Sequence, residues 1–468
     1  MKYTIYFIFC TGLLFSSCKT SKKGNLGTSL KTEETLSALP YTVSVKNPTA
    51  TNAYPTLQSY AFAQHEGKWL MVGGRTNGFH RTSTLESTFP TKTANTNIWV
   101  MDHRNKKVKS APLPASVVKH LRSTNMLFYQ DGDWLYCLGG YGSNCDNDAD
   151  ECYQTWPKLA ALNVPSIIDK IWNSTGEPDL SSDILTIDDE NMRITGGGLK
   201  KIGDYFYAVF GQNYNSIYKG GVVGVYTEEV RRFKILNDGK QLRITNYEAY
   251  KDPSGATGPE SQYHRRDLGV VSAIRTDGTK GISAYGGVFT KDGGGWMNPI
   301  YIDADATGKA RVTVDKTFKQ KFNQYECAHV LMYDPIGRNM FTSFLGGISF
   351  YYFDAAGNMV PSTDNNWLPF VKTINNVVRI SGRSSLEFPQ KPPAQLPGYL
   401  GANAIFIIAD GIATYRDSPD IIDYSKLPSG ETMVGYMYGG IEATEPQASQ
   451  INPTFASGKV YEVFVTKI

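Results

Sequence analysis

The chain has 468 residues and a formal net charge of only +3 at neutral pH. A charge this small over this length gives no concentrated basic face, so we expect no nucleic-acid partner. The 29 Tyr, 22 Phe and 45 Gly favour strands joined by turns, and long runs with helical apolar spacing are few. The composition therefore predicts an all-β protein.

The first forty residues have the features of a targeting segment. Lys2 precedes an apolar run at 3–15 that is too short to span a bilayer comfortably. Small residues then lead into Cys18, and this stretch resembles the lipobox of bacterial lipoproteins, which implies cleavage before Cys18 and lipidation of its thiol. We expect a signal peptide at 1–17, a lipidated flexible tether at 18–40 and an anchor in the bacterial envelope, at the outer membrane. The alternative is an ordinary cleaved signal peptide with a spare cysteine.

A hairpin pattern recurs along the rest of the chain. At 59–78, two apolar segments are joined by Glu66-Gly67, and the second ends in Gly73-Gly74. Residues 125–140 repeat this pattern closely, and looser copies lie at 199–211, 268–287, 327–347 and 402–440. Recurrence at long and fairly even intervals is typical of a repeat architecture.

The string Asn-Ile-Trp-Val-Met-Asp at 97–102, following such a hairpin, resembles the kelch motif. This resemblance implies a β-propeller in which each repeat builds one four-stranded blade. Six repeats are expected, and they begin near residues 57, 125, 192, 268, 327 and 402. Their strands are apolar on both faces, as blades that pack face to face require.

The ends of the chain suggest how the propeller closes. The sixth repeat ends one strand short, and the alternating segment 41–47 can supply the missing outer strand. We therefore expect a six-bladed propeller over 41–468, with seven blades, one partly built from 168–191, as the alternative. In the fifth repeat we expect 349–354 as the third strand and 377–380 as the fourth, followed by a proline-rich loop at 384–399.

The cysteines and one acidic run make separate predictions. Cys145 and Cys152 bracket a short loop, and we expect them to form a disulfide in an oxidising compartment. Cys137 and Cys327 lie in apolar strands and are expected to be buried and unpaired. Between the first two cysteines, Asp146, Asp148 and Asp150 alternate and could bind calcium through hard oxygen ligands. A solvated acidic loop is the alternative.

Long loops gather on one face of the expected propeller, and such loops commonly carry function. The candidate ligand-binding residues there are Arg75, Arg122, Arg193, His264, Arg265, Arg266 and Trp296. Guanidinium groups suit carboxylates, and neighbouring aromatic rings suit sugars. We expect a binding module for a glycan, an acidic small molecule or an envelope protein. The alternative is that these arginines pair with acidic side chains and strand-end carbonyls and fill the channel.

The kelch resemblance also allows an enzyme, so whether the chain is one is left open. A kelch-class sugar-acid mutarotase would use an arginine for the substrate carboxylate, with Glu326, His264 or His329 as the acid–base group. Galactose oxidase, another kelch-type enzyme, binds copper through Tyr and His, and Tyr263, His264, Tyr325 and His329 are the residues to compare. No cysteine can be placed for its cross-link, and copper is not expected. A purely structural subunit of an envelope complex is the third possibility.

Overall fold

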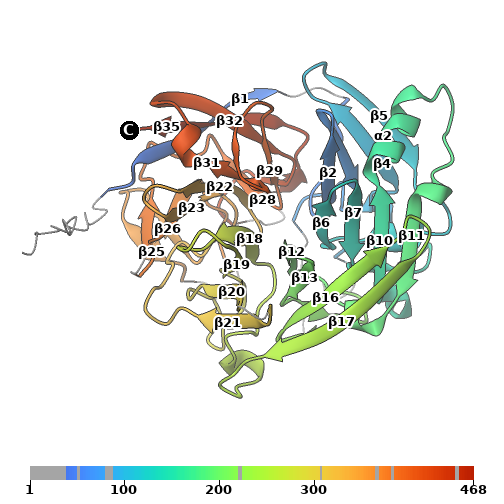
Figure 1. The fold of residues 1–468 in the computed structure, drawn as a ribbon, viewed down its shortest axis with the longest axis horizontal. Helices are drawn as coiled ribbons and strands as arrows, with labels where there is room; N and C mark the ends of the chain where they lie inside the picture. The colour runs from blue at the N-terminus through green and yellow to red at the C-terminus, as the bar shows by residue number, and fades with distance from the viewer. Residues whose placement is uncertain are drawn as a thin grey trace, which may run out of the picture. The chain divides into compact units, whose positions relative to one another are not determined.

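The computed structural model describes residues 38–49, 53–79, 88–219, 224–305, 308–363, 368–380, 384–447 and 453–468. The segment Pro40–Ile468 forms one compact unit. Strands dominate this unit, which confirms the all-β class (Figure 1). The expected signal peptide and Cys18 lie outside the described residues.

Six sheets have at least four strands each within the described ranges, all antiparallel except for one parallel pair in the fifth, and Figure 1 shows them side by side around a common centre. The first contains β2 (Ala61–His65), β3 (Lys68–Val72), β4 (Asn97–Asp102) and β5 (Lys107–Pro112). The second contains β6 (Leu127–Asp131), β7 (Trp134–Leu138), β10 (Lys158–Asn163) and β11 (Ile184–Asp188). The third contains β12 (Gly198–Ile202), β13 (Tyr205–Val209), β16 (Glu229–Asn237) and β17 (Leu242–Lys251).

The remaining three sheets follow the same strand order, with two additions. The fourth contains β18 (Gly269–Ile274), β19 (Lys280–Tyr285), β20 (Ile300–Ala304) and β21 (Ala310–Val314). The fifth contains β22 (Ala328–Asp334), β23 (Asn339–Leu345), β26 (Ile374–Arg379) and β27 (Leu386–Pro389), extended by β31 (Ser418–Asp423) and β30 (Thr414–Tyr415). The sixth contains β29 (Ile405–Ile408), β32 (Gly430–Tyr438), β35 (Val460–Lys467) and the N-terminal β1 (Tyr41–Thr49).

Short elements lie between these strands. They are α1 (Val118–Leu121), α2 (Val164–Asn173), β8 (Tyr141–Ser143), β9 (Tyr153–Thr155), β14 (Gln212–Asn213), β15 (Val225–Tyr226), β24 (Tyr351–Phe353), β25 (Met359–Pro361), β28 (Tyr399–Ala402), β33 (Ile441–Ala443) and β34 (Thr454–Ala456). The two-stranded pairs β8–β9, β14–β15 and β24–β25 and the three-stranded β28–β33–β34 sit in the connections after the Gly-Gly positions.

Three expectations about strands are corrected. Residues 168–191 do not start another sheet, because they contain the end of α2 and then β11, the fourth strand of the second sheet. In the fifth repeat, β24 pairs only with β25, so β26 is the third strand. The fourth strand, β27, lies inside the segment expected to be a loop. Periodicity missed β27 because Pro389 ends it and its side chains are only half-buried.

The N-terminal strand pairs with the C-terminal strand as expected. Tyr41 lies opposite Lys467 in an antiparallel register, and β1 is the outermost strand of the sixth sheet. Tyr41 is fully buried, its ring lies 5.2 Å from that of Phe341, and its hydroxyl is 3.0 Å from Ser343 Oγ. The first strand therefore fastens the last sheet to its neighbour, the fifth.

Hydrogen bonds through the Gly-Gly positions link the first, second, third, fifth and sixth sheets each to the next. The amides of Gly74, Gly140, Gly211 and Gly347 each donate to a carbonyl oxygen of the following repeat at 2.8 Å. Gly440 donates to Leu57 O at 2.9 Å, which joins the last repeat to the first. We call these five bonds the glycine links. In the third repeat the Gly-Gly position is occupied by Phe210-Gly211, not by Gly211-Gln212, and Phe210 adopts a φ of 56°.

Most of these positions leave no room for a side chain, and Phe210 in the third repeat is the exception. A Cβ at Gly139 would lie 1.9 Å from Ile194 O, and Gly139 itself has a φ of 65°. Apolar clusters fill the space between neighbouring sheets, including one that joins Trp69 and Met71 of the first sheet to Ile407 and Tyr438 of the sixth. The first and sixth sheets are thus joined through both a backbone bond and side-chain packing.

Replacing Tyr41 with Ala should destabilise the protein by about 3 kcal/mol, because a fully buried aromatic ring and its hydrogen bond are lost. Thr42→Ala, at an exposed position of the same strand, should cost far less. Chemical denaturation of both variants measures the difference. Equal stabilities would show that β1 contributes nothing to the folded state.

Candidate functional site

A cavity of about 440 Å³ lies where the inner ends of the six sheets meet. Its polar lining includes one residue from each repeat, immediately before or near the start of the innermost strand. These six residues, which we call the cavity belt, are Ser59, Asn125, Gly196, Asp267, Glu326 and Asn403. The pseudo-symmetric repeats therefore deliver six different side chains to one place.

The cavity belt has a shared backbone geometry. All six residues have positive φ values, between 38° and 67°. Neighbouring belt residues are bonded head to tail, since Asn125 N donates to Ser59 O, Gly196 N to Asn125 O, and Asp267 N to Gly196 O, at 3.3, 3.3 and 2.7 Å. Asn403 N likewise donates to Glu326 O. Asn and Asp tolerate this left-handed conformation better than most residues, and Glu326 is the unusual member.

The walls of the cavity differ in chemistry. Phe89, Tyr141, Tyr214 and Tyr218 belong to one cluster of packed aromatic rings, so one wall is aromatic with hydroxyl groups. The opposite wall is apolar, and it is built by Val288, Ile348, Leu368, Ala402 and Ile441 together with Phe79, Phe289 and Tyr325. A ligand would therefore meet apolar surface on its sides and polar groups at the cavity belt.

Arg266 and Asp267 form an ion pair beside the belt. The remaining nitrogens of Arg266 donate to Tyr226 OH at 3.1 Å and to Tyr218 OH at 3.0 Å. Asn125 also hydrogen-bonds the carboxylate of Asp267. A Cβ at Gly196 would lie 2.8 Å from Asp267 Oδ1, so the glycine leaves room for this carboxylate to lean toward Asn125. The charge of Arg266 is thus neutralised within the protein.

Glu326 has a different environment. Its side chain makes no hydrogen bond or ion pair to any described residue, although it lines the cavity. Burial and the charge of Asp267 raise the pKa of Glu326 well above its usual value, and Arg266 offsets only part of that effect. The cavity therefore contains one carboxyl group that is compensated and one that favours its protonated form.

The other arginines expected at this site have structural roles. Arg75 contacts Asn77 Oδ1 at 3.0 Å and stacks over Phe89, with 5.0 Å from Cζ to the ring centroid. Arg193 pairs with Glu190 and donates to Thr155 O at 2.6 Å. Arg265 is fully buried and donates to Gln262 O at 2.6 Å and Gly286 O at 3.2 Å. Of the expected ligand-binding residues, only Arg266 lines the cavity.

The expected histidines and tryptophan also lie away from the cavity lining. His264 Nδ1 is 2.6 Å from Glu228 Oε1, and its ring stacks on Tyr226. Trp296 Nε1 donates to His264 O at 2.8 Å, and its ring faces Arg265. His329 lies on β22, where burial lowers its pKa to about 3. Among the three acid–base candidates, Glu326 is the one that lines the cavity.

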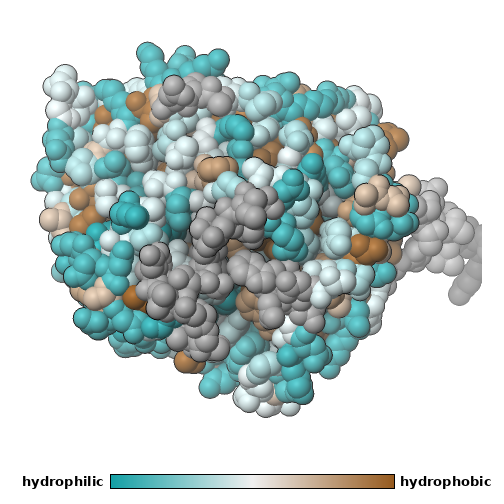
Figure 2. Space-filling model, turned by 180° about the vertical axis from the view of Figure 1, so that it is seen from behind, coloured by the Kyte–Doolittle hydropathy of each residue, from teal (hydrophilic) through white to brown (hydrophobic). Residues whose placement is uncertain are grey.

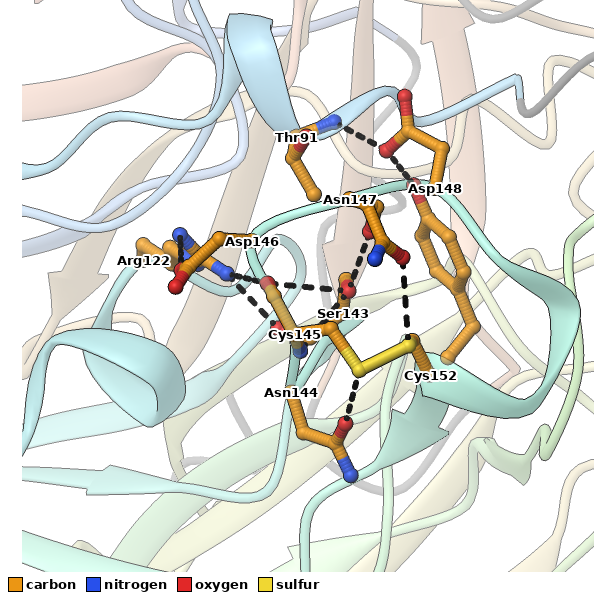
Figure 3. A network of polar contacts seen from close by, with 10 residues as sticks. Thr91, Arg122, Ser143, Asn144, Cys145, Asp146, Asn147, Asp148 and Cys152 are labelled. Atoms are coloured by element: carbon orange, nitrogen blue, oxygen red, sulfur yellow. Dashed lines mark hydrogen bonds and ion pairs between the residues drawn. A yellow bond between two sulfur atoms is a disulfide. The ribbon is translucent and has the colours of Figure 1, made fainter.

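The disulfide between Cys145 and Cys152 is confirmed, and the acidic run lies within the loop that it closes (Figure 3). Asp146 Oδ1 lies 3.7 Å from Arg122 Nη1, and the guanidinium of Arg122 also donates to Ser143 O and Cys145 O. Cys137 and Cys327 are free and buried. The loop is thus fastened at its base by Arg122.

The next two aspartates connect this loop to the aromatic wall. Asp148 accepts bonds from Thr91 N at 2.8 Å and Tyr153 OH at 2.6 Å (Figure 3). Although burial alone would raise the pKa of Asp148, these bonds hold it below its usual value. Asp150 accepts a bond from Ile217 N at 2.7 Å. The run therefore positions the segments that carry Phe89 and Tyr218.

These contacts give no support to a calcium site at Asp146, Asp148 and Asp150. The three carboxylates turn to three different partners. Within the ranges that the structure describes, no three His, Cys, Asp or Glu side chains come together in a way that could hold a metal ion.

Several lining residues were not singled out from the sequence as ligand-binding residues. They include Ser59, Asn125, Asp267 and Asn403 of the cavity belt and Tyr218 of the aromatic wall. The signal for the belt is positional, since each member precedes an innermost strand of one repeat. Tyr218 does not precede an innermost strand, so its sequence position gives no such indication. The segment that carries it is held by the hydrogen bond between Asp150 and the neighbouring Ile217.

Comparison with known proteins leaves the function to be argued from this geometry. No protein-family model matches the chain, and no curated protein matches its sequence. A solved structure titled "Structure of YjhT" aligns with a TM-score of 0.44 and 10% identity, covering 88% of this chain and 97% of that one. A likeness this distant carries no argument about the fold or the activity.

The raised pKa of Glu326 predicts a specific pH dependence of stability. A carboxyl group whose folded-state pKa is raised binds its proton more tightly in the folded state, so its contribution to stability falls as pH rises above the usual Glu value of 4.5. The slope can reach about 1.4 kcal/mol per pH unit for one proton. Glu326→Gln should therefore be more stable than the wild type at pH 7, and the difference should shrink toward pH 4.

Denaturant unfolding at several pH values measures this effect, with Glu177→Gln at an exposed position as the control. If the stability difference between wild type and Glu326→Gln were constant across pH, Glu326 would not titrate as the structure implies.

Proposed function

We propose that the protein is a closed six-bladed β-propeller that binds a small, non-acidic, sugar-like ligand in its central cavity. The six sheets would be the blades, and the glycine link from Gly440 to Leu57 supports closure between the last repeat and the first. The pairing of β1 with β35 supports closure by the N-terminal strand.

The observation that best supports a binding function is the cavity, which combines aromatic and apolar walls with the polar cavity belt. Its volume of about 440 Å³ falls in the range of small-molecule sites, about 300–1,000 Å³. Sugars present C–H faces and hydroxyl groups at the same time. The aromatic and apolar walls suit the former, and the oxygen and amide groups of the cavity belt suit the latter. A concave site of this size favours a small ligand over a protein partner.

An acidic ligand has less support than a neutral one. Arg266 is the one arginine or lysine among the described lining residues, and Asp267 already neutralises it. A second carboxyl group, Glu326, faces the same space. A sugar-acid mutarotase would need a guanidinium available for the substrate carboxylate, so the binding function is the better supported of the two.

A structural subunit that docks through an apolar surface is also less well supported. Large exposed apolar residues in the described ranges are scattered along the chain, for example Val225, Ile336 and Phe455. Figure 2 shows a face on which hydrophilic residues predominate and hydrophobic ones occur singly or in small groups. Large contiguous apolar patches are the usual mark of such docking surfaces.

The binding function predicts that neutral mono- and disaccharides raise the melting temperature, because they bind only the folded protein. Ala402→Trp, which narrows the cavity, should abolish the shift, whereas Ala356→Trp on an exposed turn should not. Thermal unfolding and calorimetric titration measure both effects. An unchanged shift in Ala402→Trp would place binding elsewhere, and no shift with any saccharide would contradict the proposal.

We also propose that Cys18 carries a lipid that anchors the protein in the bacterial envelope, at the outer membrane. The support is the sequence around Cys18, since that residue lies outside the described ranges. Among the helices of the described residues, none is long and apolar enough to cross a membrane. In a bacterial host, a labelled fatty acid should be incorporated into the full chain and not into Cys18→Ser. Equal labelling of both would rule out this anchor.

A further inference from the structure

We propose that the ligand of the central cavity carries a protonated amine, which pairs with the carboxylate of Glu326. This inference rests on the proposed sugar-binding function and narrows it to amino sugars with a free amine. It starts from Glu326, the one acidic group among the described lining residues that has no side-chain partner in the described part of the chain.

The contrast with Asp267 shows how unusual Glu326 is. Both residues belong to the cavity belt, and both line the same space. Asp267 receives the guanidinium of Arg266 and a hydrogen bond from Asn125. Glu326 receives neither an ion pair nor a side-chain hydrogen bond from any described residue. A partly buried carboxyl group without a partner is costly unless a ligand supplies one.

Among the described residues, no cation other than Arg266 lines the cavity near Glu326. The groups whose charges act on Glu326 are Asp267, Arg266 and the neighbouring Tyr325. Arg266 uses its nitrogens on Asp267, Tyr226 and Tyr218. Lys200 and His329 are not part of the cavity lining, and Lys200 lies in the field of Asp420. Within the part of the chain that the structure describes, no cation is left to pair with an ionised Glu326, so a ligand could supply one.

The aromatic lining strengthens the preference for a cation. The face of an aromatic ring is negative and attracts ammonium groups. The rings of this cavity already hold guanidinium groups, because Arg266 lies 5.8 Å from the centroid of Tyr218 and 5.4 Å from that of Phe289. Tyr325 and Tyr141 add further rings to the lining. An amine beside Glu326 would thus meet both a carboxylate and several aromatic rings.

The backbone conformation of Glu326 also indicates a ligand site. Glu326 has a φ of 38°, a conformation that side chains other than Asn and Asp rarely adopt. Strained backbone of this kind persists where the surrounding structure holds it, and it clusters at ligand sites. The bond from Tyr325 N to Ile348 O at 3.2 Å and the bond from Asn403 N to Glu326 O hold this segment in place.

Binding of an amine should be linked to proton release. Without a ligand, burial and Asp267 favour the protonated form of Glu326. A bound ammonium favours the carboxylate instead, so the proton leaves as the amine enters. Affinity should therefore increase as pH rises, until the amine of the sugar itself loses its charge.

Calorimetric titration of the whole soluble domain with matched sugars tests the inference. The probes are glucosamine and galactosamine, their N-acetyl derivatives and glucose, with calcium chloride as an inorganic cation. We expect each amino sugar to bind at least tenfold more tightly than its N-acetyl derivative, which corresponds to about 1.4 kcal/mol. Glu326→Gln keeps the shape of the side chain and should remove this preference, whereas Glu177→Gln should leave it unchanged. Titration in buffers of different ionisation enthalpy should show the released proton.

Each other outcome has a distinct meaning. Equal affinities for glucosamine and N-acetylglucosamine, or a preference that survives in Glu326→Gln, would overturn the amine inference and leave the sugar-binding function standing. Calcium binding that depends on Glu326, without amino-sugar binding, would replace the amine with an inorganic cation. No binding of any sugar by a folded wild-type protein would overturn both proposals together.

Discussion

The glycine links are the interactions on which the rest of the structure depends. In five repeats a backbone amide at the end of the second strand donates to a carbonyl oxygen of the next repeat, at 2.8 or 2.9 Å. This bond requires the two backbones to approach more closely than a side chain allows, as the 1.9 Å contact of a Cβ at Gly139 shows. It also holds the segments that precede five of the six innermost strands, and so it helps to position the cavity belt.

The cavity belt combines a repeated backbone conformation with side chains that differ between repeats. The same left-handed conformation recurs six times, but the side chains are Ser, Asn, Gly, Asp, Glu and Asn. The sequence differences between repeats therefore appear together on one small surface. Within it, Asp267 is compensated and Glu326 is not, a difference in charge that the common backbone geometry does not produce. Active and binding sites commonly retain such costs because the ligand relieves them.

The acidic loop shows how a distant feature can serve the site without touching a ligand. The disulfide and Arg122 fix the loop, and Asp148 and Asp150 then hold the segments of Phe89 and Tyr218. Alternation of aspartates suggested metal binding, but their carboxylates point to backbone amides and a tyrosine hydroxyl. Backbone amides are strong donors that must be satisfied when water is excluded, and short acidic side chains satisfy them well.

Local sequence determined much of the fold. Apolar runs, turn residues and the Gly-Gly pairs located the first two strands of every repeat, and alternation at 41–47 located β1. They failed at β27, because half-buried side chains leave no periodic pattern. The sequence also indicated the disulfide, which depends on short spacing. Arg266 and Glu326, which the sequence named as candidates, both line the cavity, because both precede an innermost strand.

Only the tertiary structure decided which charged residues share the cavity. Arg193 and Arg265, like Arg266, precede an innermost strand, and Arg75 follows a Gly-Gly pair. Each of the three others donates to acceptors that do not line the cavity. The outcome depends on distances across repeats, such as that between the Arg266 guanidinium and Tyr218 OH, which are separated by 48 positions in sequence. Pairing of this kind is set by packing in three dimensions, and it cannot be deduced from local sequence patterns.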